Sequence, residues 1–450
     1  MSDSRSLLIK RAEVSHRKLM DLRCQAGIIR ECSSELSPNP GEEVIDARGC
    51  ALIPGLHDHH IHLLSLAARL SSVECGPPSV SDSNQLAEII RTYPGHGWVR
   101  GVGYHESVAG VLNRKALDAI ERDRPIRIQH RSGRVWWLNT RALTELRLNA
   151  KGDGELYRMD ERVRQNSQLS ESFKTDIVEV FSRLLGMGVT GVTDATPSND
   201  DTMESLLKEI SADRVNVQVM GNEQLTKGPL KLLIDDYRLP DVDSFERRIS
   251  DAHRADRTVA IHCVSRVELV FALAALQRVG VVKGDRIEHA SVVDADTLES
   301  IRELGLTVVT QPNFIFERGD QYTHDLQHDE LQALYRIGGL LEEKISVGAG
   351  TDAPFGSPDP WLAIRSAVER KTNSGRVLNA DECISADRAL KLYTTPPEDP
   401  GGTPRRLDVG QCADLVLLSQ PWEETQKSLF SESVQLTIVK GKVQYKKHAA

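Results

Sequence analysis

Short apolar runs rich in β-branched residues alternate with longer stretches of helical periodicity from about residue 184 onward. This alternation is typical of a parallel sheet whose strands are connected by helices. An apolar stretch before a histidine-rich segment adds one more strand, so eight are predicted, the number that closes a (β/α)8 barrel. A doubly wound sheet is the main structural alternative. The predicted strands fall at 51–56, 188–196, 215–221, 229–236, 258–264, 285–291, 306–314 and 345–354.

One connecting segment, "DADTLESIRELG" at 294–305, shows the signals of a capped crossover helix. Asp296 stands three residues before Glu299, as in a capping box, and Gly305 is a stop signal. Apolar residues recur at helical spacing between these two signals, which predicts the face that packs on the sheet.

The alternation is interrupted at about 66–180, and both ends of the chain show strands without helices. The interruption predicts an insertion between the first two barrel strands. The ends predict a small β-sandwich built from both termini, residues 1–53 and 403–450. The expected fold class is therefore α/β, with a distorted (β/α)8 TIM barrel over 54–402 that carries the insertion, together with this terminal β-sandwich.

Composition excludes several classes of protein. The 450 residues include 56 Lys and Arg against 65 Asp and Glu, a formal charge of -9, so nucleic acid is not an expected partner. Seven scattered cysteines without a C-x-x-C spacing indicate a reducing compartment and no thiolate metal cluster. The apolar run "LVFALAAL" is too short to span a bilayer and the N-terminus lacks a secretory signal, so we expect a cytoplasmic protein without a membrane partner.

The segment "PGLHDHHIHLL" carries four histidines. Because side chains alternate along a strand, it offers two rival pairs, His57 with His59 and His60 with His62, and either pair could meet one ion. Imidazole is a common ligand of zinc and other transition metals. The H-x-H spacing also fits hydrogen-bonded core histidines, so the segment alone does not choose between these readings.

Polar residues stand at the carboxyl ends of five predicted strands, where a barrel forms its active site. Taken singly, each has a structural explanation: a core histidine, an aspartate that caps the next turn, or a lysine whose stem lies along apolar surface. Their recurrence at the same end of separate strands instead predicts a metal centre. The residues are Asp58, His60, His62, Lys231, His262, His289 and Asp352.

The order H-x-H, Lys, His, His, Asp on successive strands resembles the amidohydrolase superfamily of metal-dependent hydrolases. Several phrases are similar to its amidohydrolase 3 branch, among them "RIEHASVVDADTLESIRELGLTVVTQP", "GTDAPFGSPDPWLAIRSAV" and "VGQCADLVLL". The superfamily pattern D-x-H-x-H after "PGL" matches Asp58, His60 and His62. The resemblance implies that His60 and His62 are ligands, while His57 and His59 face away.

The resemblance also implies a site for one or two divalent ions, usually zinc, at the mouth of the barrel. In relatives with two ions the lysine at this place is carbamylated, because an ammonium could not bind a cation, and Lys231 is the matching position. Asp235 is the alternative bridging carboxylate, because alternation places it on the face of Lys231. The matching ligand positions are His60, His62, Lys231, His262, His289 and Asp352.

The expected activity is metal-dependent hydrolysis of a carbon–nitrogen bond other than a peptide bond, in an amide, formamide, cyclic ureide or carbamate. Asp352 is the expected general acid and base as well as a ligand. In a one-metal site, His262 or His289 would donate to the oxyanion. A deaminase, isomerase or ester hydrolase on the same scaffold and a non-catalytic metal-binding regulator are the alternatives.

The partner expected from this reading is a small-molecule substrate, and the sequence leaves open whether the chain forms a homodimer. Two segments hold the candidates for substrate contacts: "RIQHRSGRVWWLN" in the insertion and "QPNFIFERGD" after the seventh barrel strand. Arg131 could clamp a carboxylate, and Trp136 could form an apolar wall, although a tryptophan pair is also typical of a core. The candidates are Gln129, His130, Arg131, Trp136, Asn313 and Arg318.

Overall fold

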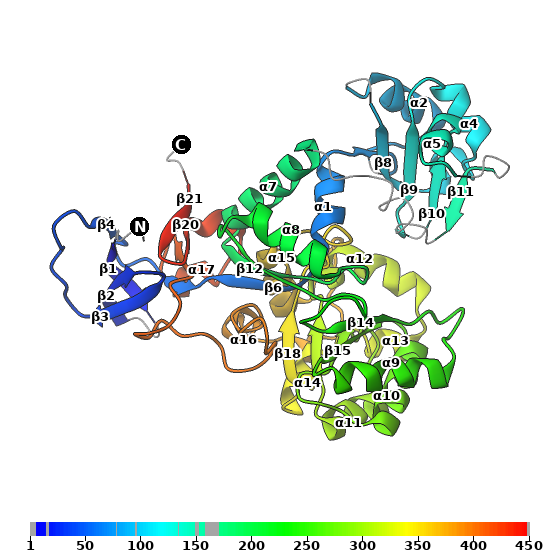
Figure 1. Ribbon diagram of the computed structural model, residues 1–450. Helices are drawn as coiled ribbons and strands as arrows, with labels where there is room; N and C mark the ends of the chain where they lie inside the picture. The colour runs from blue at the N-terminus through cyan, green and yellow to red at the C-terminus, as the bar shows by residue number, and fades with distance from the viewer. Residues whose placement is uncertain are drawn as a thin grey trace. The chain divides into compact units, whose positions relative to one another are not determined.

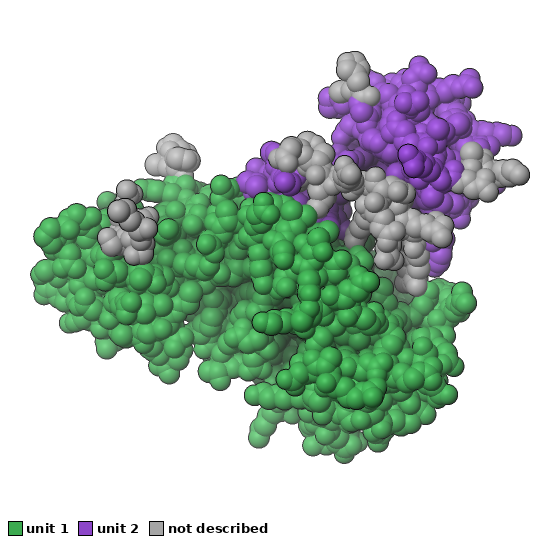
Figure 2. Space-filling model, in the orientation of Figure 1, with its two compact units in different colours: residues 1–62, 181–450 green, residues 63–180 purple. Residues whose placement is uncertain are grey.

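The computed structural model describes residues 6–14, 18–77, 79–94, 97–133, 135–148, 153–157 and 171–447. It divides into two compact units (Figure 2): unit 1 contains residues 1–62 and 181–450, and unit 2 contains residues 63–180. Unit 1 carries the predicted barrel and the strands of both termini. Among the described residues, no helix has both the length and the apolar character that crossing a membrane requires.

All eight predicted barrel strands form in unit 1. Figure 1 labels β6, β12, β14, β15 and β18 among them. One parallel sheet has the order β13-β12-β6, and a second runs from β14 to β18 in sequence order. Strands β12 and β17 are buried along their whole length, which is typical of parallel strands covered on both faces. The strands are β6 (Leu56–Ile61), β12 (Val189–Asp194), β13 (Asn216–Val219), β14 (Leu230–Leu233), β15 (Val259–Cys263), β16 (Arg286–His289), β17 (Thr307–Thr310) and β18 (Ser346–Ala349).

Backbone hydrogen bonds join the two sheets at both of their edges. At one junction the N–H of Lys231 on β14 donates to the carbonyl of Gly221, just after β13, at 2.8 Å. At the other junction the N–H of Asp352, beyond β18, donates to the carbonyl of His60 on β6, also at 2.8 Å. The barrel is therefore closed and distorted, as predicted, and its second junction brings Asp352 to the histidine strand.

The predicted crossover helix is α11 (Ala295–Leu304), and its N-terminus differs from the prediction. Asp294, rather than Asp296, is the N-cap, because its carboxylate accepts the backbone N–H of Thr297 at 2.9 Å. Asp296 lies inside the first turn, where a negative charge still interacts favourably with the helix dipole. Gly305 ends the helix in the left-handed conformation, as predicted.

The remaining helices of unit 1 connect the barrel strands or follow the barrel. One further helix, α7 (Glu171–Gly186), spans the boundary between the units. The helices of unit 1 are α8 (Asp201–Ser211), α9 (Val242–Arg254), α10 (Arg266–Val279), α12 (Asn313–Asp325), α13 (His328–Gln332), α14 (Ile337–Glu342), α15 (Pro360–Glu369), α16 (Ala386–Lys391) and α17 (Trp422–Thr425).

Strands from both ends of the chain form two four-stranded sheets, in the orders β3-β2-β1-β4 and β21-β20-β19-β5. The sheets share one hydrophobic core, to which Ile9 and Leu22 contribute from the first and Leu415 and Ile438 from the second. Since β5 leads through Gly55 into β6, this core anchors the start of the histidine strand. The strands are β1 (Leu7–Val14), β2 (Lys18–Gln25), β3 (Ile28–Ser33), β4 (Glu43–Asp46), β5 (Leu52–Pro54), β19 (Leu415–Leu418), β20 (Val434–Val439) and β21 (Lys442–Lys446).

Unit 2 has a five-stranded sheet of its own, in the order β11-β10-β9-β8-β7. Its core packs the rings of Tyr104 and Trp137, whose centroids lie 5.3 Å apart, among aliphatic side chains. Its elements are α1 (Leu63–Leu70), β7 (Val73–Glu74), α2 (Ser83–Thr92), β8 (Val99–Tyr104), α3 (Glu106–Ala109), α4 (Arg114–Ile120), β9 (Ile126–His130), β10 (Val135–Leu138), α5 (Thr140–Glu145) and β11 (Glu155–Tyr157).

Candidate metal centre

Alternation along β6 separates the four histidines into two pairs. His57 Nε2 lies 2.8 Å from Thr193 Oγ1, and His59 Nε2 lies 2.9 Å from Thr395 Oγ1. Burial lowers the pKa of both imidazoles, that of His59 to about 3, so both are neutral at physiological pH. In this structure His57 and His59 are therefore hydrogen-bonded core histidines.

Asp58, which lies between them in the sequence, holds the histidine strand against the segment after β18. Its Oδ1 accepts the backbone N–H groups of His60 and Thr351, each at 3.0 Å, and its Oδ2 accepts the Thr351 hydroxyl at 2.5 Å. Burial raises the pKa of Asp58 to about 7, and the hydrogen bonds from Thr351 and His60 offset part of that effect. Both oxygens of Asp58 thus accept hydrogen bonds that hold the backbone of His60 and the Thr351 residue in place.

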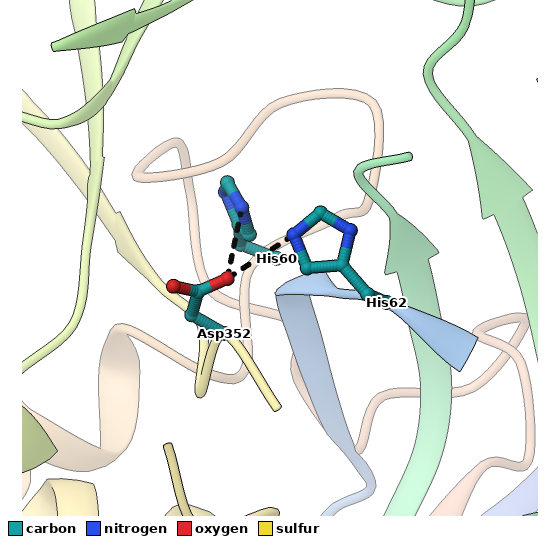
Figure 3. Close-up of side chains that lie close together, drawn as sticks. All are labelled: His60, His62 and Asp352. Atoms are coloured by element: carbon teal, nitrogen blue, oxygen red, sulfur yellow. Dashed lines mark ion pairs between the residues drawn. The ribbon is translucent and has the colours of Figure 1, made fainter. Parts of the chain in front are cut away.

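His60, His62 and Asp352 point their donor atoms at one another (Figure 3). Asp352 Oδ1 lies 3.5 Å from His60 Nε2 and 3.2 Å from His62 Nε2, and these three atoms all lie within 4.8 Å of one another. His60 and Asp352 are buried, while His62 is partly exposed. Two imidazole nitrogens and a carboxylate oxygen in this arrangement are a typical donor set for zinc.

His262 and His289 extend the cluster from β15 and β16. The ring of His289 lies 4.7 Å from that of His60 and 4.5 Å from that of His262, measured between centroids. His289 Nδ1 lies 2.7 Å from Gln311 Oε1, an oxygen that only accepts, so Nδ1 carries the proton and Nε2 is left as the ligand atom. Burial lowers the pKa of His60 and His289, which keeps both imidazoles neutral and able to bind a cation.

Two of these residues have backbone conformations that are uncommon for side-chain-bearing residues. His289 at the end of β16 has a φ of 70°, and Asp352 beyond β18 has a φ of 55°. Non-glycine residues in this left-handed region cost free energy and cluster at functional sites. Here the turn away from the strand direction redirects each side chain toward the cluster.

Lys231 lies below the cluster on β14 with 3% of its surface exposed, and its Nζ has no hydrogen-bond partner among the described residues. Its nearest carboxylate is Glu288 on β16, whose Oε2 is 4.0 Å away. Glu288 also accepts a short hydrogen bond from His60 Nδ1 and forms an ion pair with Arg286 at 2.7 Å. Glu288 thus contacts His60, Lys231 and Arg286. It was not among the candidates predicted from the sequence.

A signal for Glu288 was present in the sequence. Arg286 and Glu288 are two residues apart on a strand that is buried throughout, and charges at that spacing share one face, as an internal ion pair requires. Asp235, the expected alternative to a carbamate, has a different role, because its Oδ1 accepts the backbone N–H of Tyr237 at 3.2 Å. The carboxylate beside Lys231 comes from β16 instead.

The predicted substrate residues fall in two places. Asn313 and Arg318 lie on α12 in unit 1, where the buried Asn313 donates to the carbonyl of Thr351 at 3.1 Å. The other four candidates lie in unit 2. There the Gln129 amide donates to the Gly133 carbonyl, and the His130 ring bonds to Ser132 and Glu106. The Trp136 ring lies under the Arg127 guanidinium. Arg131 is exposed.

The carboxylate and imidazole atoms of the cluster suit a divalent cation. Asp352 Oδ1 is buried and has no hydrogen-bond partner among the described residues, although it faces two imidazoles. An unpaired buried carboxylate oxygen costs free energy unless a cation or a donor satisfies it. Neutral histidines that offer unprotonated nitrogens beside it would complete the coordination of such a cation.

A closed barrel with imidazole and carboxylate donors at the carboxyl ends of its strands defines a metal-dependent hydrolase scaffold. The family model described as "Amidohydrolase family" matches residues 43–445, and the chain belongs to this family. It is 24% identical to N-substituted formamide deformylase from Arthrobacter pascens, in an alignment that covers 91% of each chain.

Solved structures show the same fold. A metal-dependent hydrolase from Pyrococcus horikoshii superposes with a TM-score of 0.73 at 22% identity, covering 92% of this chain and 97% of that one. N-isopropylammelide isopropylaminohydrolase from Burkholderia multivorans superposes with a TM-score of 0.57 at 17% identity and covers 98% of both chains. These likenesses support the predicted TIM-barrel fold class.

Replacing Glu288 by Gln is expected to weaken zinc binding about 10- to 100-fold, because the amide is a weaker acceptor for the His60 Nδ1 proton and leaves Lys231 and Arg286 without a counter-charge. Competition with a chromophoric chelator on metal-stripped protein measures the affinity, and thermal unfolding checks the fold.

Glu382→Gln is the matched control, because Glu382 is also a buried carboxylate paired with an arginine, Arg336, at 2.9 Å. It should lower the melting temperature and leave zinc affinity within about twofold, since mutations at separate sites act independently. Equal zinc affinity in Glu288→Gln and the unaltered protein would contradict the positioning role of Glu288.

Proposed function

We propose that this chain is a metal-dependent amidohydrolase that cleaves a carbon–nitrogen bond other than a peptide bond in a small molecule. The substrate classes are amides, formamides, cyclic ureides and carbamates. The convergence of His60 Nε2, His62 Nε2 and Asp352 Oδ1 carries the proposal. Relatives named as a formamide deformylase and as an isopropylaminohydrolase support it.

A divalent ion, which we expect to be zinc, would supply a Lewis acid that polarises a carbonyl and makes a water molecule acidic near neutral pH. His60, His62, His262 and His289 would hold it through their imidazole nitrogens. Gln311 fixes the proton of His289 on Nδ1, and Glu288 does the same for His60, so each presents Nε2. These two contacts orient the ligands before any substrate binds.

Asp352 is assigned the proton transfers. Its Oδ1 is free of hydrogen bonds to the described residues and faces the two histidines, so it can accept a proton from water and return it to the leaving nitrogen. Asp58 is the nearby carboxylate that could compete for this role. Its oxygens already accept three hydrogen bonds from His60 and Thr351, which suits a positioning role.

In a version with one ion, His262 rather than His289 would donate to the oxyanion of the scissile carbonyl, because the Nδ1 proton of His289 is directed at Gln311 Oε1. A deaminase, an isomerase or an ester hydrolase could use the same donors, so the substrate decides between these classes. A cytoplasmic location remains our expectation, which the seven free cysteines support.

Purified protein is expected to carry one or two transition-metal ions per chain, with zinc as the expected metal, and to hydrolyse members of a library of N-acyl, N-formyl, hydantoin and ester compounds. Elemental analysis gives the metal content, and release of amine or acid gives the activity. Stripping the metal should abolish turnover, and zinc should restore it. Fewer than about 0.2 ions per chain after metal-supplemented expression would contradict the metal centre, while turnover of the esters alone would move the chain to another reaction class.

Asp352→Asn is expected to retain the fold and lose at least about a hundredfold in kcat, because general acid-base groups contribute 10² to 10⁴ in rate. Asp359→Asn is the matched control, since Asp359 caps α15 through the N–H of Trp361 and asparagine can cap equally well. Turnover by Asp352→Asn close to that of the control would show that another group transfers the proton.

Lys231 is expected to be carbamylated when two ions are bound. Carbon dioxide forms a bond to the neutral amine nitrogen, and one proton is released, so an anionic ligand replaces a cation. An unmodified ammonium at ~4 Å from a divalent ion would be repelled by several kcal/mol at an effective dielectric constant of about 20. Burial lowers the pKa of Lys231, which favours the reactive neutral amine.

Lys231→Ala should therefore reduce the metal content from two ions toward one, and propionate should partly restore activity by replacing the carboxylate. ¹³C NMR after incubation with labelled bicarbonate should show a carbamate signal that Lys231→Ala lacks. The exposed Lys227→Ala is the control and should retain it. An electron-density map from protein made with bicarbonate that shows an unmodified Lys231 directed away from the metals would overturn this prediction.

A further inference from the structure

Arg318 lies in the wall of the barrel mouth that also carries Asp352. It sits on α12, directly after the seventh barrel strand, and its Nη2 donates to the carbonyl of Phe355 at 2.6 Å. Phe355 follows Asp352 by three residues, and its ring meets the His62 ring edge-on, with centroids 5.5 Å apart. The guanidinium is therefore tied to the same turn that holds the metal cluster.

The guanidinium is oriented but has no anionic partner. It lies over the Phe314 ring, 3.9 Å from the centroid, and none of the described carboxylates is within ion-pair distance of it. By contrast, Arg336 pairs with Glu382 and Arg286 pairs with Glu288. Stacking on Phe314 covers one face of the Arg318 plane, and the N–H groups that do not bond to Phe355 or Tyr322 are left for a ligand.

Hydroxyl-bearing side chains lie close to Arg318 and connect it to the segment after His289. Tyr322 is one turn along α12 from Arg318, and Tyr335 lies 6.3 Å from Tyr322 between ring centroids. The Ser291 hydroxyl, two residues after His289, donates to Tyr335 Oη at 3.1 Å. Burial alone would lower the pKa of Arg318, and Tyr322, Tyr335 and Asp352 raise it, so the guanidinium is a stable cation in this wall.

We propose that Arg318 is an anion subsite that binds a carboxylate on the substrate, next to the group that is hydrolysed. This proposal rests on the proposed function and narrows its substrate to N-acyl or N-formyl compounds that carry a carboxylate. A planar guanidinium binds a planar carboxylate through two parallel charge-assisted hydrogen bonds. One cation among aromatic side chains suits a singly charged group better than a phosphate, which needs more positive charge.

N-formylphenylalanine and N-formylphenethylamine test the subsite, because they differ only by the carboxylate. The unaltered zinc-loaded protein should prefer the anionic compound in kcat/KM, mainly through KM. Arg318→Gln should reduce that preference at least about thirtyfold, the effect of losing a charge-assisted pair. Arg318→Lys should show a preference between that of the unaltered protein and that of Arg318→Gln, because lysine keeps the charge and loses the paired hydrogen bonds.

Arg365→Gln is the matched control, since Arg365 on α15 also lies over a phenylalanine ring, that of Phe430, at 4.3 Å. It should leave the preference unchanged, which separates loss of the subsite from loss of an arginine–phenylalanine contact. A second readout without turnover is calorimetric binding of 3-phenylpropionate and of its amide to metal-free protein. Only the acid should bind, and Arg318→Gln should abolish that binding.

Hydrolysis of both formyl compounds without a preference for the acid would overturn the subsite and leave the proposed function in place. Binding of 3-phenylpropionate that depends on Arg318, without hydrolysis of any library compound, would support the subsite and contradict the proposed function. Equal binding of acid and amide to metal-free protein would also overturn the subsite.

Discussion

The metal centre depends on one buried carboxylate. Glu288 accepts the Nδ1 proton of His60, lies 4.0 Å from Lys231 Nζ and pairs with Arg286 at 2.7 Å. Removing this charge would leave two buried cations without compensation and would free the His60 ring to rotate. Because breaking one member of a buried ion pair is strongly destabilising, ligand orientation and barrel stability depend on the same side chain.

Closure of the barrel is the second constraint, and it explains why the donors come from distant parts of the sequence. Asp58 binds Thr351 through both of its oxygens, which fixes the end of the eighth strand against the first. At Gly350 an added Cβ would lie 2.4 Å from the backbone nitrogen of His60, so only glycine permits this approach. The chain then turns through the left-handed Asp352, whose carboxylate reaches the histidines.

The sequence predicts the barrel well because strands such as β12 and β17 are buried along their whole length and are rich in β-branched residues. It predicts the ligands because polar residues at the ends of such strands are conspicuous. Strand β2 has a less clear pattern, because its buried positions include Asp21 and Arg23, charges that are satisfied by distant partners such as Glu42, 2.8 Å from Arg23. Glu288 was missed for the same reason, since a pattern does not show which distant groups satisfy a buried charge.

Charge balance couples the state of Lys231 to the number of ions that the centre can hold. With an ammonium on Lys231, the formal charges of Lys231, Arg286, Glu288 and Asp352 cancel. A carbamate changes the lysine from a cation to an anion and shifts the cluster by two charge units, which is the charge of one additional divalent ion. A centre with one ion and an ammonium thus has the same net charge as a centre with two ions and a carbamate. Two ions with an ammonium would add two positive charges to that value. The carbamate thus offsets the charge of a second ion, so lysine modification should favour binding of that ion, and binding of the ion should in turn stabilise the carbamate.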